Sequence, residues 1–210
     1  MSNIKFEYIK GDILRMSKKN AKISVLGLDR AGKTTMLQRL KTGRWIPDTT
    51  PTIGMNAETI QIGDVTFSAW DLGGQLQFRR ALWEMYTKNS AGLIYVIDIS
   101  DPARFPEARN NLWRMLKMNH LKDIPLAIFA NKVDIFEDGQ AITEDDLANF
   151  MGINKKMSRV LNIFNTSAKT GVGIHKGIYW LADAIQEGGQ HTSMEMYVIK
   201  SLFGSEATIS

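Results

Sequence analysis

The stretch Gly27-Leu28-Asp29-Arg30-Ala31-Gly32-Lys33-Thr34 decides how the rest of this chain is interpreted. It satisfies the pattern G-x-x-x-x-G-K-[ST], and it lies between an apolar run, Lys22 to Leu26, and a helical pattern that begins at Lys33. The two glycines let the backbone curl so that successive N–H groups point at phosphate oxygens, and the following helix adds its positive end. Lys33 would neutralise the outer phosphates, and Thr34 would offer a hydroxyl to Mg2+. The sequence therefore predicts a phosphate-binding loop.

Outward from this loop, short apolar runs alternate with segments of helical periodicity. Strands are predicted at Lys22 to Leu26, Met55 to Ile62, Val65 to Trp70, Gly92 to Asp98, Pro125 to Ala130 and Val160 to Asn165. Helices are predicted from Lys33, near Phe78 to Lys88, over Pro102 to Met118, after Thr143 and over Ile174 to Glu187. A hairpin turn at Ile62-Gly63-Asp64 makes the second and third strands antiparallel. The predicted fold is α/β of the P-loop NTPase type, with a mainly parallel six-stranded sheet, one antiparallel edge pair and helices on both faces.

The composition suits one globular domain in a reducing, cytoplasmic setting. The 210 residues are 44% hydrophobic and 23% charged, and no cysteine is present for a disulfide, a zinc-thiolate site or prenylation. The net charge of +4 comes from Lys and Arg residues spread along the chain, which argues against nucleic acid and permits contact with an anionic membrane surface. The longest apolar stretch, Ala91 to Ile99, is too short to span a membrane.

A second motif, Trp70-Asp71-Leu72-Gly73-Gly74-Gln75, ends the third predicted strand with a carboxylate. Asp71 is therefore placed to hold Mg2+ through water, as a Walker-B-type aspartate does. The glycines that follow allow a backbone N–H to approach a terminal phosphate, and Gln75 can orient an attacking water. Alone, this motif fits an ordinary strand end and turn; downstream of a phosphate-binding loop it is much more specific.

The nucleotide base is predicted from two further motifs at strand ends. Asn131-Lys132-Val133-Asp134 follows the fifth predicted strand, and Ser167-Ala168-Lys169 follows the sixth. Guanine presents an N1–H and an N2 amino group side by side, and the Asp134 carboxylate can accept from both, whereas adenine has no such pair. The Lys132 stem can pack along the base, Asn131 can tie the loop to neighbouring backbone, and the 167–169 segment can offer an N–H to guanine O6.

With these motifs in order, the chain resembles the Ras-superfamily small GTPases, and within them the Arf/Sar family. The segments that carry the resemblance, which covers Ala21 to Glu187, are Gly27 to Thr34, Pro51-Thr52-Ile53-Gly54, Trp70 to Gln75, Arg80-Ala81-Leu82-Trp83 and Asn131 to Asp134. The resemblance implies a switch that is off with GDP and on with GTP, and that hydrolyses GTP slowly without an activating protein. It also implies that the two strands from Met55 to Trp70 shift register when GTP binds.

The resemblance assigns further roles by position. Thr52 would add a second hydroxyl to Mg2+, Gly74 would contact the gamma-phosphate, and Gln75, Lys33 and Thr52 would serve catalysis. The full set expected at the nucleotide is Gly27, Leu28, Asp29, Arg30, Ala31, Gly32, Lys33, Thr34, Thr35, Thr52, Gly74, Asn131, Lys132, Asp134, Ser167, Ala168 and Lys169. Effectors, an exchange factor and an activating protein would be its partners, with effectors reading a surface formed by Met55, Trp70 and Tyr86.

The ends of the chain depart from the family pattern. Ser2 in place of glycine excludes N-myristoylation. Residues 1–20 form a predicted arm that is either an amphipathic helix, docked on the domain with GDP and touching membrane on activation, or a permanently packed or frayed segment. Beyond the predicted GTPase domain, residues 21–187, an extension over 188–210 carries Met194, Val198 and Leu202 on one possible helical face. This extension packs on the domain, meets a partner or membrane, or is disordered.

Two alternatives concern chemistry. Arg30 lies inside the phosphate-binding loop, where its guanidinium either reaches the phosphates as a built-in arginine finger or stays in solvent. The chain itself is either a hydrolysing switch in membrane trafficking or a GTP-binding scaffold or obligate subunit with little turnover. An ATP-using P-loop enzyme is a more distant third reading, because Asp134 would then have no base to recognise.

Overall fold

The computed structural model describes residues 21–46, 58–62, 65–71, 84–137, 140–154 and 159–186, and at positions 58, 62, 70 and 71 it describes the backbone alone. The strands are β1 (Ala21–Gly27), β2 (Glu58–Ile62), β3 (Val65–Asp71), β4 (Gly92–Asp98), β5 (Leu126–Asn131) and β6 (Leu161–Thr166). The α-helices are α2 (Lys33–Thr42), α4 (Phe105–Leu116), α5 (Glu144–Met151) and α6 (Ile174–Gln186), and short 3-10 turns cover Pro102–Arg104, Asn119–Leu121 and Val133–Ile135. Residues 84–87 are also helical.

The six strands form one sheet in the order β2-β3-β1-β4-β5-β6. Only the β2–β3 pair is antiparallel, and every other neighbouring pair is parallel. The predicted α/β fold with one antiparallel edge pair is confirmed. The part of the predicted second strand from Met55 to Ala57 and the part of the predicted helix from Phe78 to Trp83 lie outside the described residues.

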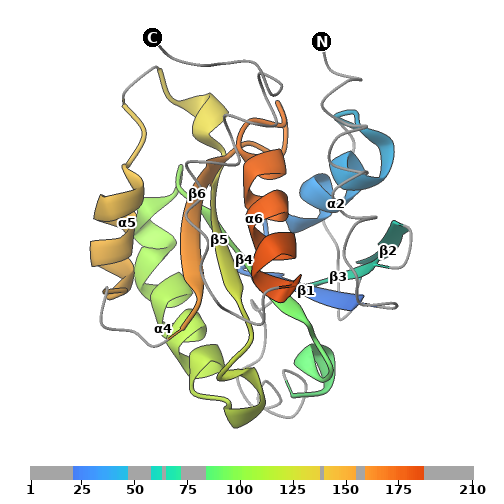
Figure 1. Ribbon diagram of the computed structural model, residues 1–210. Helices are drawn as coiled ribbons and strands as arrows, with labels where there is room; N and C mark the ends of the chain where they lie inside the picture. The colour runs from blue at the N-terminus through green and yellow to red at the C-terminus, as the bar shows by residue number, and fades with distance from the viewer. Residues whose placement is uncertain are drawn as a thin grey trace, which may run out of the picture.

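Helices cover both faces of the sheet because alternate residues of each central strand point to opposite sides. On one face, α2 and α6 pack on Ile23, Val25, Ile94 and Phe129. On the other face, α4 and α5 pack on Leu93, Tyr95, Ile97 and Ile128. In Figure 1, α6 lies in front of the strands with α2 toward the right, and α4 and α5 stand at the left.

The helix predicted over Pro102 to Met118 divides into the turn Pro102–Arg104 and α4. The physical reason is Pro106, which lacks an N–H and fits only the first turn of an α-helix, so that α4 begins at Phe105. Further along the chain, α5 starts where Thr143 accepts from the Asp146 N–H and three acidic residues occupy the first turn.

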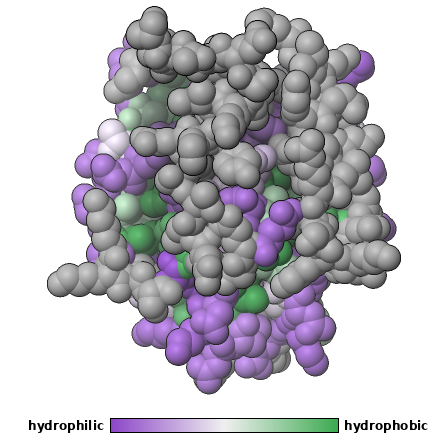
Figure 2. All heavy atoms as spheres, in the orientation of Figure 1, coloured by the Kyte–Doolittle hydropathy of each residue, from purple (hydrophilic) through white to green (hydrophobic). Residues whose placement is uncertain are grey.

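The described surface is mixed in character. In the orientation of Figure 1, hydrophilic residues dominate the lower rim of the molecule, and hydrophobic residues show as separate spots between them (Figure 2). Among the described residues, no helix is both long and apolar enough to cross a membrane.

Candidate functional site

The site begins where β1 ends, at a loop that requires glycine twice. Gly27 has φ +150°, and a Cβ there would lie 2.3 Å from the carbonyl oxygen of Val96 on β4. Gly32 has φ +95°, and a Cβ there would lie 2.4 Å from Nδ2 of Asn131. Both positions combine a backbone conformation that side chains avoid with a close neighbour. The loop 27–34 therefore lies close against β4 and β5.

Lys33 opens α2 and is buried, with 4% of its surface exposed. Its ammonium donates to the carbonyl oxygens of Gly27 (3.1 Å) and Leu28 (2.6 Å), so it lies back across the start of the loop. The Lys33 ammonium and the N-terminus of α2 place positive charge together at this loop, an arrangement that favours an anion there.

Asp29 and Arg30, at the second and third variable positions of the loop, differ in their contacts. Asp29 is held by Arg104, whose Nη2 donates to Oδ1 (2.6 Å) and whose Nη1 donates to the Asp29 carbonyl oxygen (3.0 Å). This guanidinium keeps the pKa of the Asp29 carboxyl below its usual range. Arg30 is exposed with φ +62°, and its guanidinium makes no hydrogen bond or ion pair with the described residues.

Asn131, the last residue of β5, joins three segments of the chain. Its Nδ2 donates to the carbonyl oxygen of Ala31 in the loop (2.8 Å), and its Oδ1 accepts from the N–H of Ala168 (2.9 Å). The Thr166 hydroxyl approaches the same Oδ1 at 3.5 Å. Because the Asn131 side chain is buried, these bonds replace water and fix the spacing between the loops that follow β1, β5 and β6.

Lys132 departs from the strand with φ +77°. Its ammonium lies 2.6 Å from Oδ2 of Asp98, the last residue of β4, and forms an ion pair with it. The other oxygen of Asp98 accepts from the backbone N–H (2.9 Å) and the hydroxyl (2.5 Å) of Ser100. The Lys132 head is thus anchored on a neighbouring strand, which leaves its aliphatic stem as the part of the side chain able to lie along a base.

Asp134 is held by the loop that follows β6. The Ser167 hydroxyl donates to its Oδ1 (2.5 Å), and the Lys169 ammonium lies 3.9 Å from its Oδ2. Ser167 is fully buried, and its Oγ also accepts from the Thr170 N–H (2.9 Å). A carboxylate has about four lone-pair sites, so Asp134 keeps acceptor capacity for two adjacent donors of a ligand. The Ala168 N–H already donates to Asn131, so guanine O6 would share it in a three-centre bond.

The structure brings the predicted residues of four segments to one edge of the sheet, 27–35, 71, 131–134 and 167–169. Asp71, the last residue of β3, is the register partner of Gly27 on β1, so its backbone lies beside the start of the loop. Thr52, Gly74, Gln75 and Met55 lie outside the described residues, as do the side chains of Trp70 and Asp71. Tyr86 is half-buried, and its carbonyl oxygen accepts from Lys22 (2.7 Å) and Ser24 (3.0 Å).

Sequence reasoning missed four residues that shape this edge: Arg39, Trp45, Asp98 and Arg104. For Asp98 a signal exists, since a carboxylate that ends a buried strand of a parallel sheet is placed at the ligand-binding edge. Nothing in the local pattern distinguishes the two arginines or the tryptophan, because their partners lie far along the chain.

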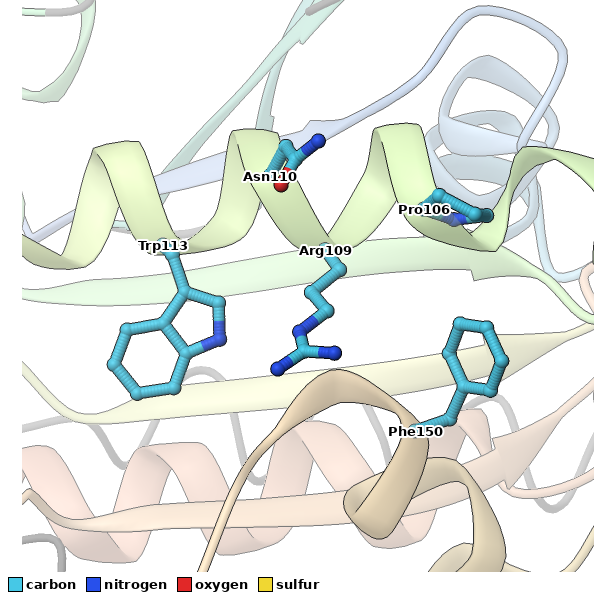
Figure 3. A pocket seen from close by; sticks show the side chains of 5 residues that line it. All are labelled: Pro106, Arg109, Asn110, Trp113 and Phe150. Carbon is cyan, nitrogen blue, oxygen red and sulfur yellow. The ribbon is translucent and has the colours of Figure 1, made fainter.

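A separate hollow of about 410 Å3 lies between α4 and the end of α5. Figure 3 shows its lining, in which the Arg109 guanidinium points between the Trp113 and Phe150 rings, Pro106 lies nearer the start of α4, and Asn110 projects from the other side of that helix. None of the residues predicted at the nucleotide lines this hollow.

The chain matches a known protein family. The model of the ADP-ribosylation factor (Arf) family matches residues 9–185 of the chain, a range that contains every segment of the site described above.

Proposed function

Because this chain belongs to the ADP-ribosylation factor family, whose members are small GTPase switches, we propose that it binds GDP and GTP with Mg2+ and hydrolyses GTP. The change of nucleotide would alter the segments around Thr52 and Gln75 and so recruit effectors, in membrane trafficking. The fold and the arrangement of the loops at the carboxyl edge of the sheet support this proposal.

The observation that carries the proposal is the Asn131 side chain. Through two hydrogen bonds it links the phosphate-binding loop at Ala31 to the base-binding loop at Ala168. The proposed ligand would span both loops, with phosphate at the Ala31 side and a hydrogen-bonding ring at the Ala168 side. A nucleotide has this form, and Asp134, kept in place by Ser167, favours guanine because it accepts from two adjacent donors.

At the phosphate end, the chain's own groups supply charge and donors. Lys33 and the N-terminus of α2 would stabilise the beta- and gamma-phosphates, and Thr34, Thr52 and water held by Asp71 would hold Mg2+. When bound, Mg2+ supplies positive charge to the beta- and gamma-phosphate oxygens. Gln75 would orient a water that attacks the gamma-phosphorus while the bond to the bridging oxygen breaks, which yields GDP and phosphate. The residues described here suit this chemistry, since the loop places a buried cation and a helix N-terminus together.

Hydrolysis is tested with Gln75→Leu. In single-turnover assays with GTP and Mg2+, we expect this variant to bind GTP as the unaltered protein does and to hydrolyse it about 10²-fold more slowly. If the unaltered protein binds GTP and does not hydrolyse it, the scaffold or obligate-subunit alternative is correct.

Base recognition is tested with Asp134→Asn. An amide offers one acceptor and one donor, so the variant should lose affinity for GDP and gain affinity for xanthosine diphosphate, whose C2 carbonyl replaces the amino group. In the unaltered protein, bound GDP should be displaced by GTP and not by ATP. Displacement by ATP would show that the base is not read as proposed.

For Arg30, we propose that the exposed guanidinium of the loop reaches the phosphates of bound GTP. Arg30→Ala should then lower the single-turnover rate by about 10³-fold, the size of an arginine-finger effect. An unchanged rate would show that Arg30 is a solvated side chain.

Partner contacts form the remaining part of the proposal. Effectors would bind at Met55, Trp70 and Tyr86, and an exchange factor and an activating protein would act on the same switch. The predicted arm at 1–20 and the extension at 188–210 are tested by truncation after Glu187 and, separately, before Ala21, with vesicle binding and thermal unfolding measured together. Vesicle binding that depends on either segment would support peripheral membrane contact.

A further inference from the structure

The Lys169 side chain, at the outer side of the proposed base site, lies between a carboxylate and an aromatic ring. Its ammonium is 3.9 Å from Oδ2 of Asp134 and 5.4 Å from the centroid of the Trp45 ring. Lys169 would otherwise be free to move, since 58% of its side chain is exposed. An ammonium near an aromatic face is attracted by the negative potential of that face. Trp45 and Asp134 therefore act together to hold the Lys169 head beside the carboxylate that would read the base.

Trp45 reaches this position because of the way α2 ends. The helix stops at Thr42, and Gly43, with φ +72°, donates its N–H to the carbonyl oxygen of Arg39 (2.8 Å). The Thr42 hydroxyl then accepts from the Arg44 N–H (3.2 Å), which tightens the turn. Trp45, the residue after Arg44, has 45% of its surface exposed. An exposed tryptophan at a turn has little core packing to explain it, which makes its contact with Lys169 informative.

Arg39 joins α2, which precedes Trp45, to the loop after β6, which carries Lys169. Its Nε donates to the carbonyl oxygen of Ala168 (2.7 Å), and its Nη2 donates to the carbonyl oxygen of Lys169. Gly171 makes room for the guanidinium, since a Cβ there would lie 2.9 Å from Nη1 of Arg39. Thus α2 carries the proposed phosphate-binding residue Lys33 at its start, and near its end Arg39 binds the loop proposed to contact the base.

From this geometry we propose that Trp45 is a positioning residue that holds Lys169 as the outer wall of the base site and thereby slows the release of guanine nucleotide. The inference rests on the proposed function, since it assumes that a guanine base lies against Asp134. Trp45 would act on retention of the base and not on the phosphate chemistry, because its cation–π contact is with Lys169 in the loop after β6.

The first test is the rate of GDP release in Mg2+ from the full-length protein carrying Trp45→Ala. A cation–π contact at an exposed site is worth about a twofold to fivefold effect, rising to about thirtyfold where a ligand excludes water. We expect release to be faster within this range, and we expect the single-turnover hydrolysis of GTP already bound to be unchanged. Ile46→Ala is the matched control, because Ile46 is the adjacent residue and is similarly exposed (39%). It should release GDP at the unaltered rate.

Two further variants separate positioning from simple packing. Trp45→Phe keeps an aromatic face and should restore most of the slow release. Lys169→Met keeps the aliphatic stem and removes the charge, so it should release GDP faster, and Trp45→Ala should add little in its presence. Lys176→Met, which removes an exposed lysine from α6, controls for the loss of one positive charge.

The outcomes distinguish the inference from the proposed function. If the unaltered protein retains GDP and Trp45→Ala releases it at the same rate, the inference is wrong and the proposed function stands. The inference is also wrong if the effects of Trp45→Ala and Lys169→Met are independent, or if Trp45→Ala lowers the unfolding temperature without changing release. If the unaltered protein binds no guanine nucleotide, both fail.

Discussion

At the scale of single residues, Asn131 shows how a short polar side chain can organise a site made from distant parts of the chain. Its amide uses a donor and an acceptor at once, on Ala31 and Ala168, which lie 100 and 37 residues away in sequence. Aspartate could not donate to Ala31, and a longer glutamine would not fit beside Gly32, where an added Cβ would lie 2.4 Å from the Asn131 Nδ2. The choice of asparagine therefore follows from geometry and donor pattern together.

Replacing Asn131 with Ala should destabilise the protein even without nucleotide. The change leaves the buried carbonyl of Ala31 and the N–H of Ala168 without this partner, and each buried polar group left unpaired costs about 1–3 kcal/mol. We expect the free energy of unfolding to fall by about 2–4 kcal/mol in urea denaturation. Asn110→Ala, which removes an exposed asparagine from α4, should change it little. Equal effects of the two substitutions would contradict this account.

The Arg104–Asp29 contact makes a prediction about pH. Arg104 lowers the pKa of the Asp29 carboxyl by hydrogen bonding to its charged form, so the contact stabilises the folded state fully above about pH 4, the ordinary pKa of aspartate, and is lost as the pH falls through the lowered pKa. The partners are partly exposed, and solvent screening limits the gain to about 0.2–1 kcal/mol. Arg104→Ala should therefore be less stable than the unaltered protein at pH 7, and the difference should shrink toward pH 2–3.

The control for this pH dependence is Arg114→Ala, which removes an exposed arginine from α4, the helix that follows Arg104. Its stability relative to the unaltered protein should not vary with pH in the same window. A constant difference for Arg104→Ala between pH 7 and pH 3, measured by denaturation, would show that the guanidinium acts through packing and not through Asp29.

At the scale of elements, the close approach of α6 to the sheet depends on Gly177. A Cβ at this helical position would lie 2.4 Å from Cε1 and 2.6 Å from Cζ of Phe129. Phe129 cannot easily turn away, because its ring packs edge-on against Phe164, which in turn contacts Trp180. The sequence predicts α6 from its periodicity, and the depth at which α6 lies comes from this glycine.

Gly177→Ala has two opposing effects on the free energy of unfolding, and their sizes can be compared. Alanine favours the helix by about 1 kcal/mol over glycine, whereas overpacking a buried aromatic contact costs about 1–3 kcal/mol. Since the Cβ would lie well inside contact distance, we expect the steric cost to prevail, with a net loss of about 1–2 kcal/mol in thermal or urea unfolding. Adding Phe129→Leu, which clears the ring from that space, should make the alanine substitution less costly. A stabilised Gly177→Ala single variant would contradict the steric argument.

At the scale of the whole molecule, the proposed site exists only because the sheet order places β1 between β3 and β4, with β5 next to β4 and β6 next to β5. Each of the contributing loops follows a parallel strand, so all of them open at the same edge. A ligand at that edge binds several segments at once and binds the folded state alone. Ligand binding should therefore raise the free energy of unfolding of the whole domain.

Adding GDP and Mg2+ to nucleotide-free protein should raise the unfolding temperature. A ligand at 1,000 times its dissociation constant stabilises the folded state by about 4 kcal/mol, which for a chain of this length corresponds to roughly 10 °C. Chelation of Mg2+ with EDTA should reverse part of the shift, and ADP at the same concentration should produce none. A shift of equal size with ADP would argue against recognition of guanine by Asp134.

The amino-acid sequence alone predicts the order of the elements and the residue types at the strand ends. Strand bounds read from apolar runs agree with β1, β4, β5 and β6 to within one residue, because buried parallel strands need continuous apolar segments and end at glycine or polar residues. The sequence likewise predicts Asn131, Asp134 and Ser167 after neighbouring strands, whose ends a parallel topology brings to one edge, and in the structure Ser167 donates to Asp134.

How these residues are held depends on packing between segments that are distant in the sequence. The contacts of Arg39 with Ala168, Arg104 with Asp29, Lys132 with Asp98 and Trp45 with Lys169 join segments that local pattern does not relate. A side chain's partner depends on which helix covers which face of the sheet and how closely it packs, and glycines such as Gly171 and Gly177 set that distance through contacts that appear only after folding. The motif predicts what the edge of the sheet can bind, and the packing of α2, α4 and α6 around it determines how firmly each binding group is placed.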